Sequence, residues 1–194
     1  MIGAILAGGL GRRMGGGGKA ARTLAGRPLM AYPLEAMAEV CEMVVVVCKR
    51  GTALPEIDGL DRWDEPDTPQ HPLTGIVHAL ERAEAPVLVC GADMPFVTAD
   101  ALRSLLMSAG GSRGARVVIA TAAGRTQPVL GVYAPSALDS LRAAPADAPL
   151  TETVAALGSA KVALPPRMLA GVNTPEELAE AEAALALPRG TGSP

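Results

Sequence analysis

Short runs of apolar residues alternate along this chain with longer segments in which apolar and charged residues recur at helical spacing. The continuous apolar runs, five or six residues each, are typical of strands buried on both faces, and they lie at 2–6, 43–48, 86–90, 115–120 and 128–133. The helical segments fall between and after them, around 28–40, 74–83, 98–107 and 135–142. Strands that alternate with helices predict a mostly parallel sheet covered on both faces. We therefore expect an α/β fold, a single three-layer Rossmann-like domain.

Weaker patterns complete the domain, and they predict a short helix and a short strand at 150–156 and 161–164. A last helix opens at "NTPEEL", where Asn173 or Thr174 can cap the helix and Pro175 can occupy its first turn. The tail "PRGTGSP" (188–194) is rich in Pro, Gly and Ser, so we expect it to be disordered. The domain itself is expected to span 1–187.

The first apolar run leads into a glycine-rich, basic segment, "ILAGGLGRRMGGGGKAARTLAGRPL" (5–29). It contains eight glycines and no acidic residue. Glycine permits the positive φ angles that let several backbone N–H groups converge on one point. With the cations Arg12, Arg13 and Lys19 added, the segment is typical of a polyphosphate-binding loop rather than of a simple turn.

Two well-known phosphate loops do not fit this segment. A Walker A loop needs a glycine where the chain has Arg13 and a hydroxyl where it has Ala20. The Rossmann spacing G-x-G-x-x-[GA] is met only from Gly15 onward, which is too far from the strand to place the pyrophosphate at a helix start. The sequence thus indicates another kind of nucleotide-binding loop.

Composition narrows the function classes further. The chain has 194 residues, enough for one domain, with 49% hydrophobic but only 2% aromatic residues, which argues against stacking of nucleic-acid bases on aromatic side chains. A formal net charge of -3 gives no general attraction to nucleic acid or to a membrane surface. The three cysteines form no CxxC pair, and no apolar run is long enough to span a bilayer. We expect a soluble cytoplasmic protein that binds neither nucleic acid nor membrane.

The spacing of the glycine loop, followed by "LAGRPL" (24–29), resembles that of the nucleotidyltransferases that activate small phosphorylated compounds with a nucleoside triphosphate. Within them it is most similar to the molybdenum cofactor guanylyltransferases, and the resemblance covers residues 2 to about 185. It implies a nucleotide-diphospho-sugar transferase-like fold. It also implies that the first part of the loop binds the nucleotide through Leu6, Ala7, Gly8 and Gly9. Two cations further along the loop, Arg13 and Lys19, would bind the phosphates.

A triphosphate donor also implies Mg²⁺, which binds one or two carboxylates together with phosphate oxygens and water. Asp93 in "CGADMPFV" directly follows a predicted strand, where α/β sheets bind ligands. The resemblance implies that Asp93 binds the metal. It also implies that Asp93, Arg13 and Lys19 are the catalytic residues. The alternative is an aspartate that only caps a turn before Pro95.

Two further residues are candidates by the same resemblance. Asp64 in "RWDEPDTPQHPLTG" aligns with a nucleotide-contacting residue, although Glu65 and Asp67 lie close enough to leave the assignment open, and a solvated acidic loop is the alternative. Asn173 aligns with a residue on the pterin side, or it only begins a helix. His71 and His78 have no partner at metal-ligand spacing, so no chemistry is assigned to them.

The resemblance implies transfer of GMP from GTP to the phosphate of molybdenum-molybdopterin, with release of pyrophosphate. It also implies transient contact with proteins that supply or receive the cofactor. Gly8 favours guanine, since the cytidylyl branch tends to have alanine there. Val47, Gly18 and Gly171 depart from residues that are common in the family, and Val47 means that a hydrogen bond expected near the nucleotide is missing or comes from elsewhere. The alternatives are a relative that uses CTP or another phosphorylated acceptor, and a GTP-binding adaptor without turnover.

Overall fold

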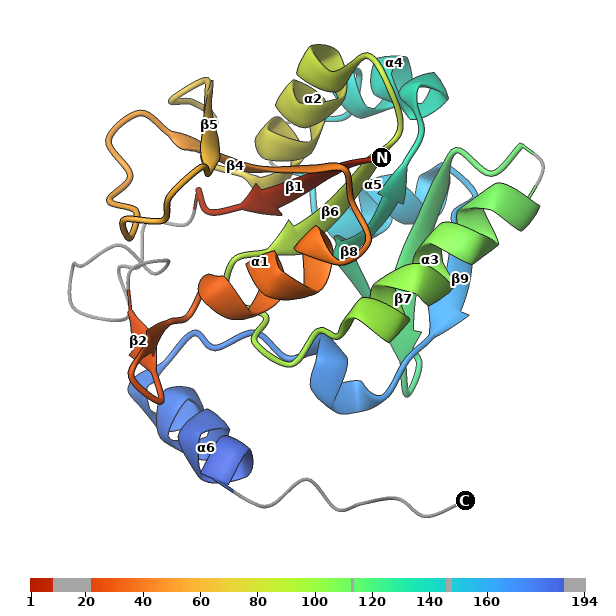
Figure 1. The fold of residues 1–194 in the computed structure, drawn as a ribbon. Helices are drawn as coiled ribbons and strands as arrows, with labels where there is room; N and C mark the ends of the chain where they lie inside the picture. Colours follow the sequence, from red (N-terminus) through yellow and green to blue (C-terminus); the bar gives the residue numbers. More distant parts are fainter. Residues whose placement is uncertain (9–21, 113, 146–147, 187–194) are drawn as a thin grey trace.

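The computed structural model describes residues 1–8, 22–112, 114–145 and 148–186, and they form a layered α/β structure around a seven-stranded sheet (Figure 1). The strand order is β5-β4-β1-β6-β8-β7-β9. The strand bounds are β1 Ile2–Leu6, β4 Met43–Lys49, β5 Asp61–Glu65, β6 Val87–Gly91, β7 Val117–Ala122, β8 Arg125–Tyr133 and β9 Ala160–Ala163. Every strand predicted from an apolar run is present within a few residues of its expected bounds.

The sheet is mostly parallel, as predicted, and β8 is its one antiparallel member among the described strands. β1 lies between β4 and β6 and is parallel to both, with Leu6 opposite Val47 and Gly91. β7 and β8 form a hairpin whose two-residue turn is Ala123–Gly124, both at positive φ. Such a turn matches the twist of paired strands, so β8 enters the sheet antiparallel to β6 and β7.

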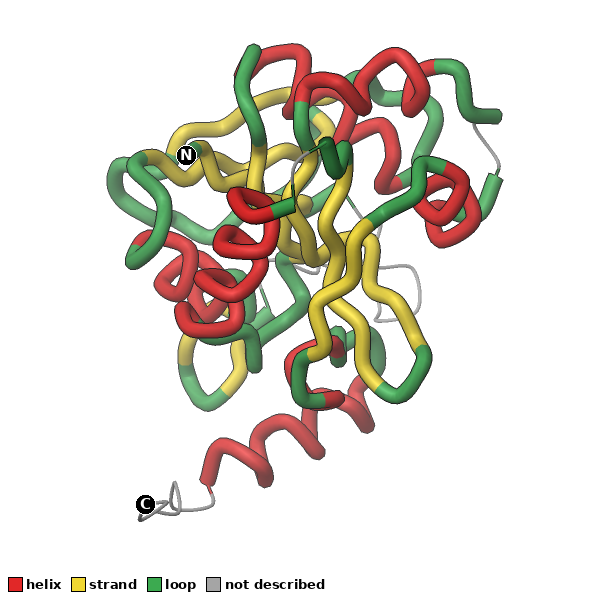
Figure 2. The backbone as a smooth tube through the Cα atoms, turned by 90° about the vertical axis from the view of Figure 1, so that its right-hand side faces the viewer, coloured by secondary structure: helices red, strands yellow, loops and turns green. Residues whose placement is uncertain are grey.

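Helices cover both faces of the sheet, which confirms the three-layer prediction (Figures 1 and 2). α1 (Ala31–Ala38) and α3 (Ala99–Gly111) pack on one face, and α2 (Pro72–Ala83), α4 (Leu138–Arg142) and α5 (Leu150–Ala156) pack on the other. Neighbouring residues of one strand point to opposite faces. Accordingly, Ile5 belongs to the core beneath α1 and α3, and Ala4 to the core beneath α2.

A smaller unit lies at one end of the sheet, where Figure 1 shows α6 (Pro175–Ala186) beside β2 (Thr23–Leu24). β2 pairs with β3 (Arg27–Pro28) in a short hairpin, and the described residues include 3₁₀ turns at Pro135–Ala137 and Pro166–Leu169. Leu24, Leu29, Val172 and Ala181 form a separate apolar cluster there. This cluster joins the C-terminal segment to the chain that follows the glycine loop.

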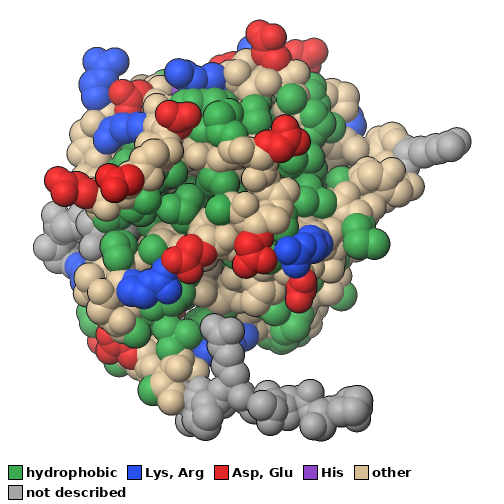
Figure 3. Space-filling model, viewed as in Figure 1, with side chains coloured by type: hydrophobic (Ala, Val, Ile, Leu, Met, Phe, Trp, Pro, Cys, Tyr) green, Lys and Arg blue, Asp and Glu red, His purple; other side chains and the backbone are tan. Residues whose placement is uncertain are grey.

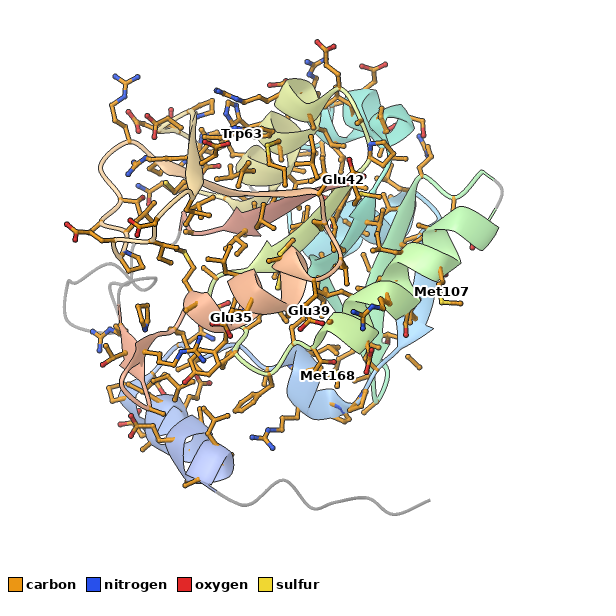
Figure 4. The ribbon with its side chains drawn as sticks, in the orientation of Figure 1. Glu35, Glu39, Glu42, Trp63, Met107 and Met168 are labelled. Atoms are coloured by element: carbon orange, nitrogen blue, oxygen red, sulfur yellow. The ribbon has the colours of Figure 1, made fainter. Side chains whose placement is uncertain are left out.

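β5 and the β2–β3 hairpin were not predicted. β5 reads "DRWDE", and only Trp63 and Glu65 of its five residues are buried. A charged edge strand therefore carries no apolar run for the pattern to detect. Trp63 points toward α2, as Figure 4 shows, and Arg82 of that helix lies over its ring at 5.0 Å.

The outer surface of α1 and α3 carries acidic and basic side chains side by side (Figure 3). Arg27 pairs with Glu35, and Arg103 pairs with Glu39 and Asp100. Opposite charges this close leave no extended field of one sign on that face.

Among the described helices none has the length and apolar character that crossing a membrane requires. The expected tail, 188–194, lies outside the described residues.

Candidate functional site

A cavity of about 300 Å³ opens at the edge of the sheet where β1, β4 and β6 end. Carboxyl ends of parallel strands meet at one edge, which is where open α/β sheets bind ligands. The cavity wall combines strand ends, the start of α2 and a segment near the C-terminus: Leu6, Ala7, Gly8, Val47, Glu65, Gln70, His71, Pro72, Gly75, Gly91, Ala92, Asp93, Val129 and Asn173.

The backbone after β1 forms one side of this cavity. The Ala7 N–H donates to the Val47 carbonyl over 2.9 Å, and the Leu6 carbonyl accepts from the Ala92 N–H over 3.0 Å. A Cβ atom at Gly8 would collide with Oε1 of Glu65. A residue other than glycine at position 8 would therefore displace the Glu65 carboxylate.

Asp93 lies two residues beyond β6, and its carboxylate is confined by two glycines. A Cβ at Gly91 would lie 2.9 Å from Oδ1 of Asp93, and one at Gly171 would lie 3.2 Å from Oδ2. The Val172 N–H donates to the Asp93 carbonyl over 2.8 Å, which ties the C-terminal segment to the end of β6. Gly171, a departure from the common family residue, thus leaves the space that the Asp93 carboxylate occupies.

Asn173 reaches the same place from the start of α6. Its Nδ2 donates to the Gly171 carbonyl over 3.0 Å, so the side chain turns back toward Asp93. Thr174 is the residue that caps the helix: its Oγ1 accepts from the Glu177 N–H at 3.2 Å, and Glu177 accepts in return from the N–H groups of Asn173 and Thr174. This reciprocal capping box holds the start of α6, and Asn173 lines the cavity.

Asp64 does not line this cavity. β5 alternates, so Asp64 is exposed while its neighbour Glu65 is buried. Asp64 accepts from Nε of Arg62 over 2.7 Å, and this hydrogen bond lowers the pKa of the Asp64 carboxyl. The cavity acid from this strand is Glu65, and a contact between Asp64 and a nucleotide stays a prediction.

Glu65 is paired with Lys49 at the end of the neighbouring strand. Their side chains are 4% and 9% exposed, and Nζ of Lys49 lies 3.5 Å from Oε1 of Glu65. Burial raises the pKa of the Glu65 carboxyl, and the Lys49 charge acts in the opposite direction. Because Lys49 and Glu65 occupy matching positions in the parallel pair β4–β5, the sheet register brings them together.

The start of α2 forms the remaining wall. His71 is the N-cap, and its Nδ1 accepts from the Leu73 N–H over 3.2 Å. The positive end of the helix dipole therefore lies at the cavity beside Gln70 and His71. Sequence reasoning assigned His71 no chemistry. The one signal for it was its position directly before the "PLTG" that opens the helix. His78 lies further along α2, outside the cavity, and its burial lowers its pKa.

Five of the predicted site residues thus line one cavity, although they come from distant parts of the chain: Leu6, Ala7, Gly8, Asp93 and Asn173. The predicted loop residues Gly9, Arg13 and Lys19 lie outside the described part of the chain. Within that part no three side chains of the His, Cys, Asp and Glu types gather as a metal cluster.

Comparison with known proteins shows the family to which this chain belongs. The family described as "MobA-like NTP transferase domain" matches residues 3–162. The chain belongs to this family. It is a nucleotidyltransferase, and its fold is the one that the sequence predicted.

Curated relatives match over nearly the whole chain. A molybdenum cofactor guanylyltransferase of Cereibacter sphaeroides is 32% identical over 95% of this chain and 97% of its own length. One of Bradyrhizobium sp. (strain ORS 278) is 32% identical over 93% and 91%. Among solved structures, a molybdopterin-guanine dinucleotide biosynthesis protein A of Archaeoglobus fulgidus superposes with a TM-score of 0.78 at 25% identity, over 95% of this chain and 98% of that one.

The cavity of this nucleotidyltransferase suits a single-carboxylate Mg²⁺ site. Mg²⁺ retains water and substrate phosphates and needs only one or two protein carboxylates. Asp93 offers one carboxylate at the mouth of the sheet, in a space kept open by Gly91 and Gly171. The donor set therefore fits a metal that arrives with a nucleoside triphosphate.

Proposed function

We propose that this protein transfers the guanylyl group of GTP to the phosphate of molybdenum-molybdopterin, giving the guanine dinucleotide form of the cofactor and pyrophosphate. The observation that carries the proposal is the convergence of the Leu6–Gly8 backbone, Asp93 and Asn173 on one cavity. The names of the relatives supply the base and the acceptor.

The reaction does not require a side chain that acts as a strong base or as a nucleophile. The acceptor phosphate is already ionised at neutral pH, so it can attack the α-phosphorus of GTP directly while pyrophosphate leaves. What the protein must provide is alignment of the reacting groups and neutralisation of the charge that grows on the leaving group. In this proposal the Leu6–Gly8 backbone binds the nucleoside, and Arg13 and Lys19 bind the phosphates as a planar fork and a point charge.

Asp93 is the residue that would hold Mg²⁺, which when bound would neutralise charge on the phosphates of the donor. The two glycines beside Asp93 leave the room that its carboxylate occupies. Asn173, hydrogen-bonded to Gly171 and next to Asp93, would contact the acceptor. The donor and acceptor sites would then meet where the C-terminal segment joins the end of β6.

The proposal also includes the ligands, the cellular location and the partner proteins. GTP and molybdopterin would be the ligands, in the cytoplasm. Proteins that make the cofactor, and the molybdoenzymes that use it, would contact this one only transiently.

Pyrophosphate release tests the proposal. Each of the four nucleoside triphosphates is incubated with the protein and Mg²⁺, with and without molybdenum-molybdopterin. Release that requires both GTP and the pterin is the expected result. Faster release with CTP would overturn the guanylyl assignment, and tight GTP binding without any release would indicate a nucleotide-binding adaptor instead of an enzyme.

A further inference from the structure

Strand β8 changes its register with β7 beside the cavity. Two adjacent residues of β7 pair with Gly131 and Gln127 of β8, so the residues between these two, 128–130, form a bulge. Pro128 suits this place because proline has no N–H to donate to a ladder. Bulges redirect side chains next to functional sites, and this bulge contains Val129, which lines the cavity.

Tyr133 holds the bulge from inside the protein. Its side chain is fully buried, and its hydroxyl donates to the Pro128 carbonyl over 2.6 Å. A buried carbonyl that leaves the ladder needs another donor, because buried polar groups without partners cost free energy. The bulge is therefore a defined part of the fold, and the backbone of Gln127 next to it is held in place.

Gln127 connects this part of β8 to the C-terminal segment. Its half-buried amide donates from Nε2 to the Leu169 carbonyl over 3.0 Å, although the two residues are 42 positions apart in the chain. Leu169 ends the 3₁₀ turn Pro166–Leu169, and its side chain packs against the core beneath α1 and α3. The hydrogen bond thus holds the point at which the chain leaves this turn toward α6, a path that Figure 1 shows in blue.

The segment that follows Leu169 is short and is held again at its far end. Only three residues lie between Leu169 and Asn173. The Val172 N–H donates to the Asp93 carbonyl, and Nδ2 of Asn173 donates to the Gly171 carbonyl. The position of Asn173 at the cavity therefore depends on both attachments, one through Gln127 on β8 and one at the end of β6.

The other parts of the cavity are held without Gln127. The Ala92 N–H donates to the Leu6 carbonyl, and the Met94 N–H donates to the Gly91 carbonyl, so the sheet itself holds the loop that carries Asp93. β6 lies between β8 and β1 in the sheet, which separates Gln127 from the backbone that follows β1. Loss of the Gln127 hydrogen bond should therefore displace Asn173 and leave Asp93 in place.

We propose that Gln127 is a positioning residue for the phosphorylated acceptor, because through the Leu169 carbonyl it sets where Asn173 lies at the cavity. This inference rests on the proposed function, in which Asn173 contacts the acceptor. The donor nucleotide is bound on the other side of β6 in that proposal. Gln127 therefore governs the affinity for the acceptor and not the affinity for GTP.

The test compares Gln127→Glu with Gln127→His. Glutamate keeps the shape but replaces the donor by an acceptor that repels the Leu169 carbonyl, whereas the Nε2–H of histidine can donate at a similar reach. Gln127→Glu should raise the KM for molybdenum-molybdopterin about tenfold, while kcat and the dissociation constant for GTP change by less than about twofold. Gln127→His should restore most of the wild-type KM.

Amide hydrogen exchange measures the attachment without any substrate. In residues 170–173 it should be about fivefold faster in Gln127→Glu than in the wild type, and close to normal in Gln127→His. Arg125→Ala, which changes an exposed side chain at the start of the same strand, should leave both the exchange and the KM unchanged. Thermal melting shows that each variant is folded, and if Gln127→Glu is not, Gln127→Leu, which also lacks the donor, decides.

The outcomes distinguish the role of Gln127 from the function on which it rests. A wild type that transfers no guanylyl group to the pterin would contradict the proposed function, and the acceptor role of Gln127 with it. With an active wild type, a folded Gln127→Glu whose KM for the pterin is unchanged would overturn the role of Gln127 alone. A loss of GTP affinity as large as the rise in that KM would overturn it as well.

Discussion

At the scale of single residues, two carboxylates of the cavity wall lie close against glycines. Asp93 is confined between Gly91 and Gly171, and Glu65 between Gly8 and Gly75. In each pair one glycine adjoins a strand end and the other comes from a distant part of the chain. A Cβ atom at any of the four positions would press on one of these two carboxylates.

The first prediction concerns Asp93. Asp93→Asn keeps the shape of the side chain but removes the charge that attracts Mg²⁺, so guanylyl transfer should fall by orders of magnitude while the protein stays folded. GTP should still bind, with less dependence on Mg²⁺. Melting temperature, GTP affinity with and without Mg²⁺, and pyrophosphate release are measured on the variant and on the control Asp100→Asn, an exposed acid paired with Arg103. Near-normal turnover in Asp93→Asn would refute the metal-binding role.

The second prediction concerns the Lys49–Glu65 pair and its pH dependence. Burial raises the pKa of Glu65 above its ordinary value, and Lys49 opposes that effect, so Lys49→Met should raise this pKa further. Between the ordinary and the raised pKa the folded variant holds a proton that the unfolded chain has released. Its free energy of unfolding therefore falls as the pH rises through that window.

Urea denaturation across the weakly acidic to neutral range measures this effect. Lys49→Met should be destabilised by about 3 kcal/mol at neutral pH, the usual cost of leaving one partner of a buried pair uncompensated. The loss should shrink on acidification, leaving only the part due to the lost hydrogen bonds to Pro66 and Pro69. In the double variant Lys49→Met/Glu65→Gln the part of the pH dependence of the free energy of unfolding that comes from Glu65 should disappear. An equal destabilisation at every pH would contradict the account.

At the scale of elements, the sequence predicted what apolar patterning controls. The central strands β1, β4 and β6 are continuous apolar runs because both of their faces are buried, and they were located to within a residue or two. β5 escaped because an edge strand with two buried residues has no such run. The short β2–β3 hairpin follows from a local turn at Ala25–Gly26, both at positive φ, rather than from hydrophobic patterning.

The same limits explain what could be foreseen of the site. Asp93 and Asn173 lie in segments that resemble known relatives, so they could be assigned to the site by resemblance. Asp64 and Glu65 are adjacent acids, and only the strand register decides which of them is buried. The space that Gly171 leaves for Asp93 depends on contacts between residues far apart in the chain, and no local pattern reports it.

The third prediction concerns α6, which rests on a small apolar cluster of its own. Thr174→Ala removes the side chain that caps the helix, which costs about 1 kcal/mol. Amide hydrogen exchange should therefore become about fivefold faster within α6, while the central strands keep their protection. Thr174→Ser keeps the hydroxyl and should show normal exchange. Faster exchange throughout the sheet would mean that α6 does not open independently.

At the scale of the whole molecule, the sheet brings together parts of the chain that are distant in sequence. Figure 1 shows β1 among the inner strands of the sheet and α6 below the sheet. The segment that leads into α6 passes the end of β6, where the Val172 N–H donates to the Asp93 carbonyl. Residues 6–8, Asp93 and Asn173 meet in consequence at one cavity. In the proposed reaction the donor would be bound by the early strands and the acceptor by the C-terminal segment, so neither half of the chain would suffice alone.

Transfer of the α-phosphate tests this account most directly. The protein is incubated with Mg²⁺, molybdenum-molybdopterin and GTP labelled with ³²P at the α position, and in parallel with GTP labelled at the γ position. The α label should appear in a dinucleotide that contains both the pterin and guanosine, and the γ label should appear in pyrophosphate. An α label that remains in GTP or GMP, with no labelled pterin dinucleotide, would contradict the proposed guanylyl transfer.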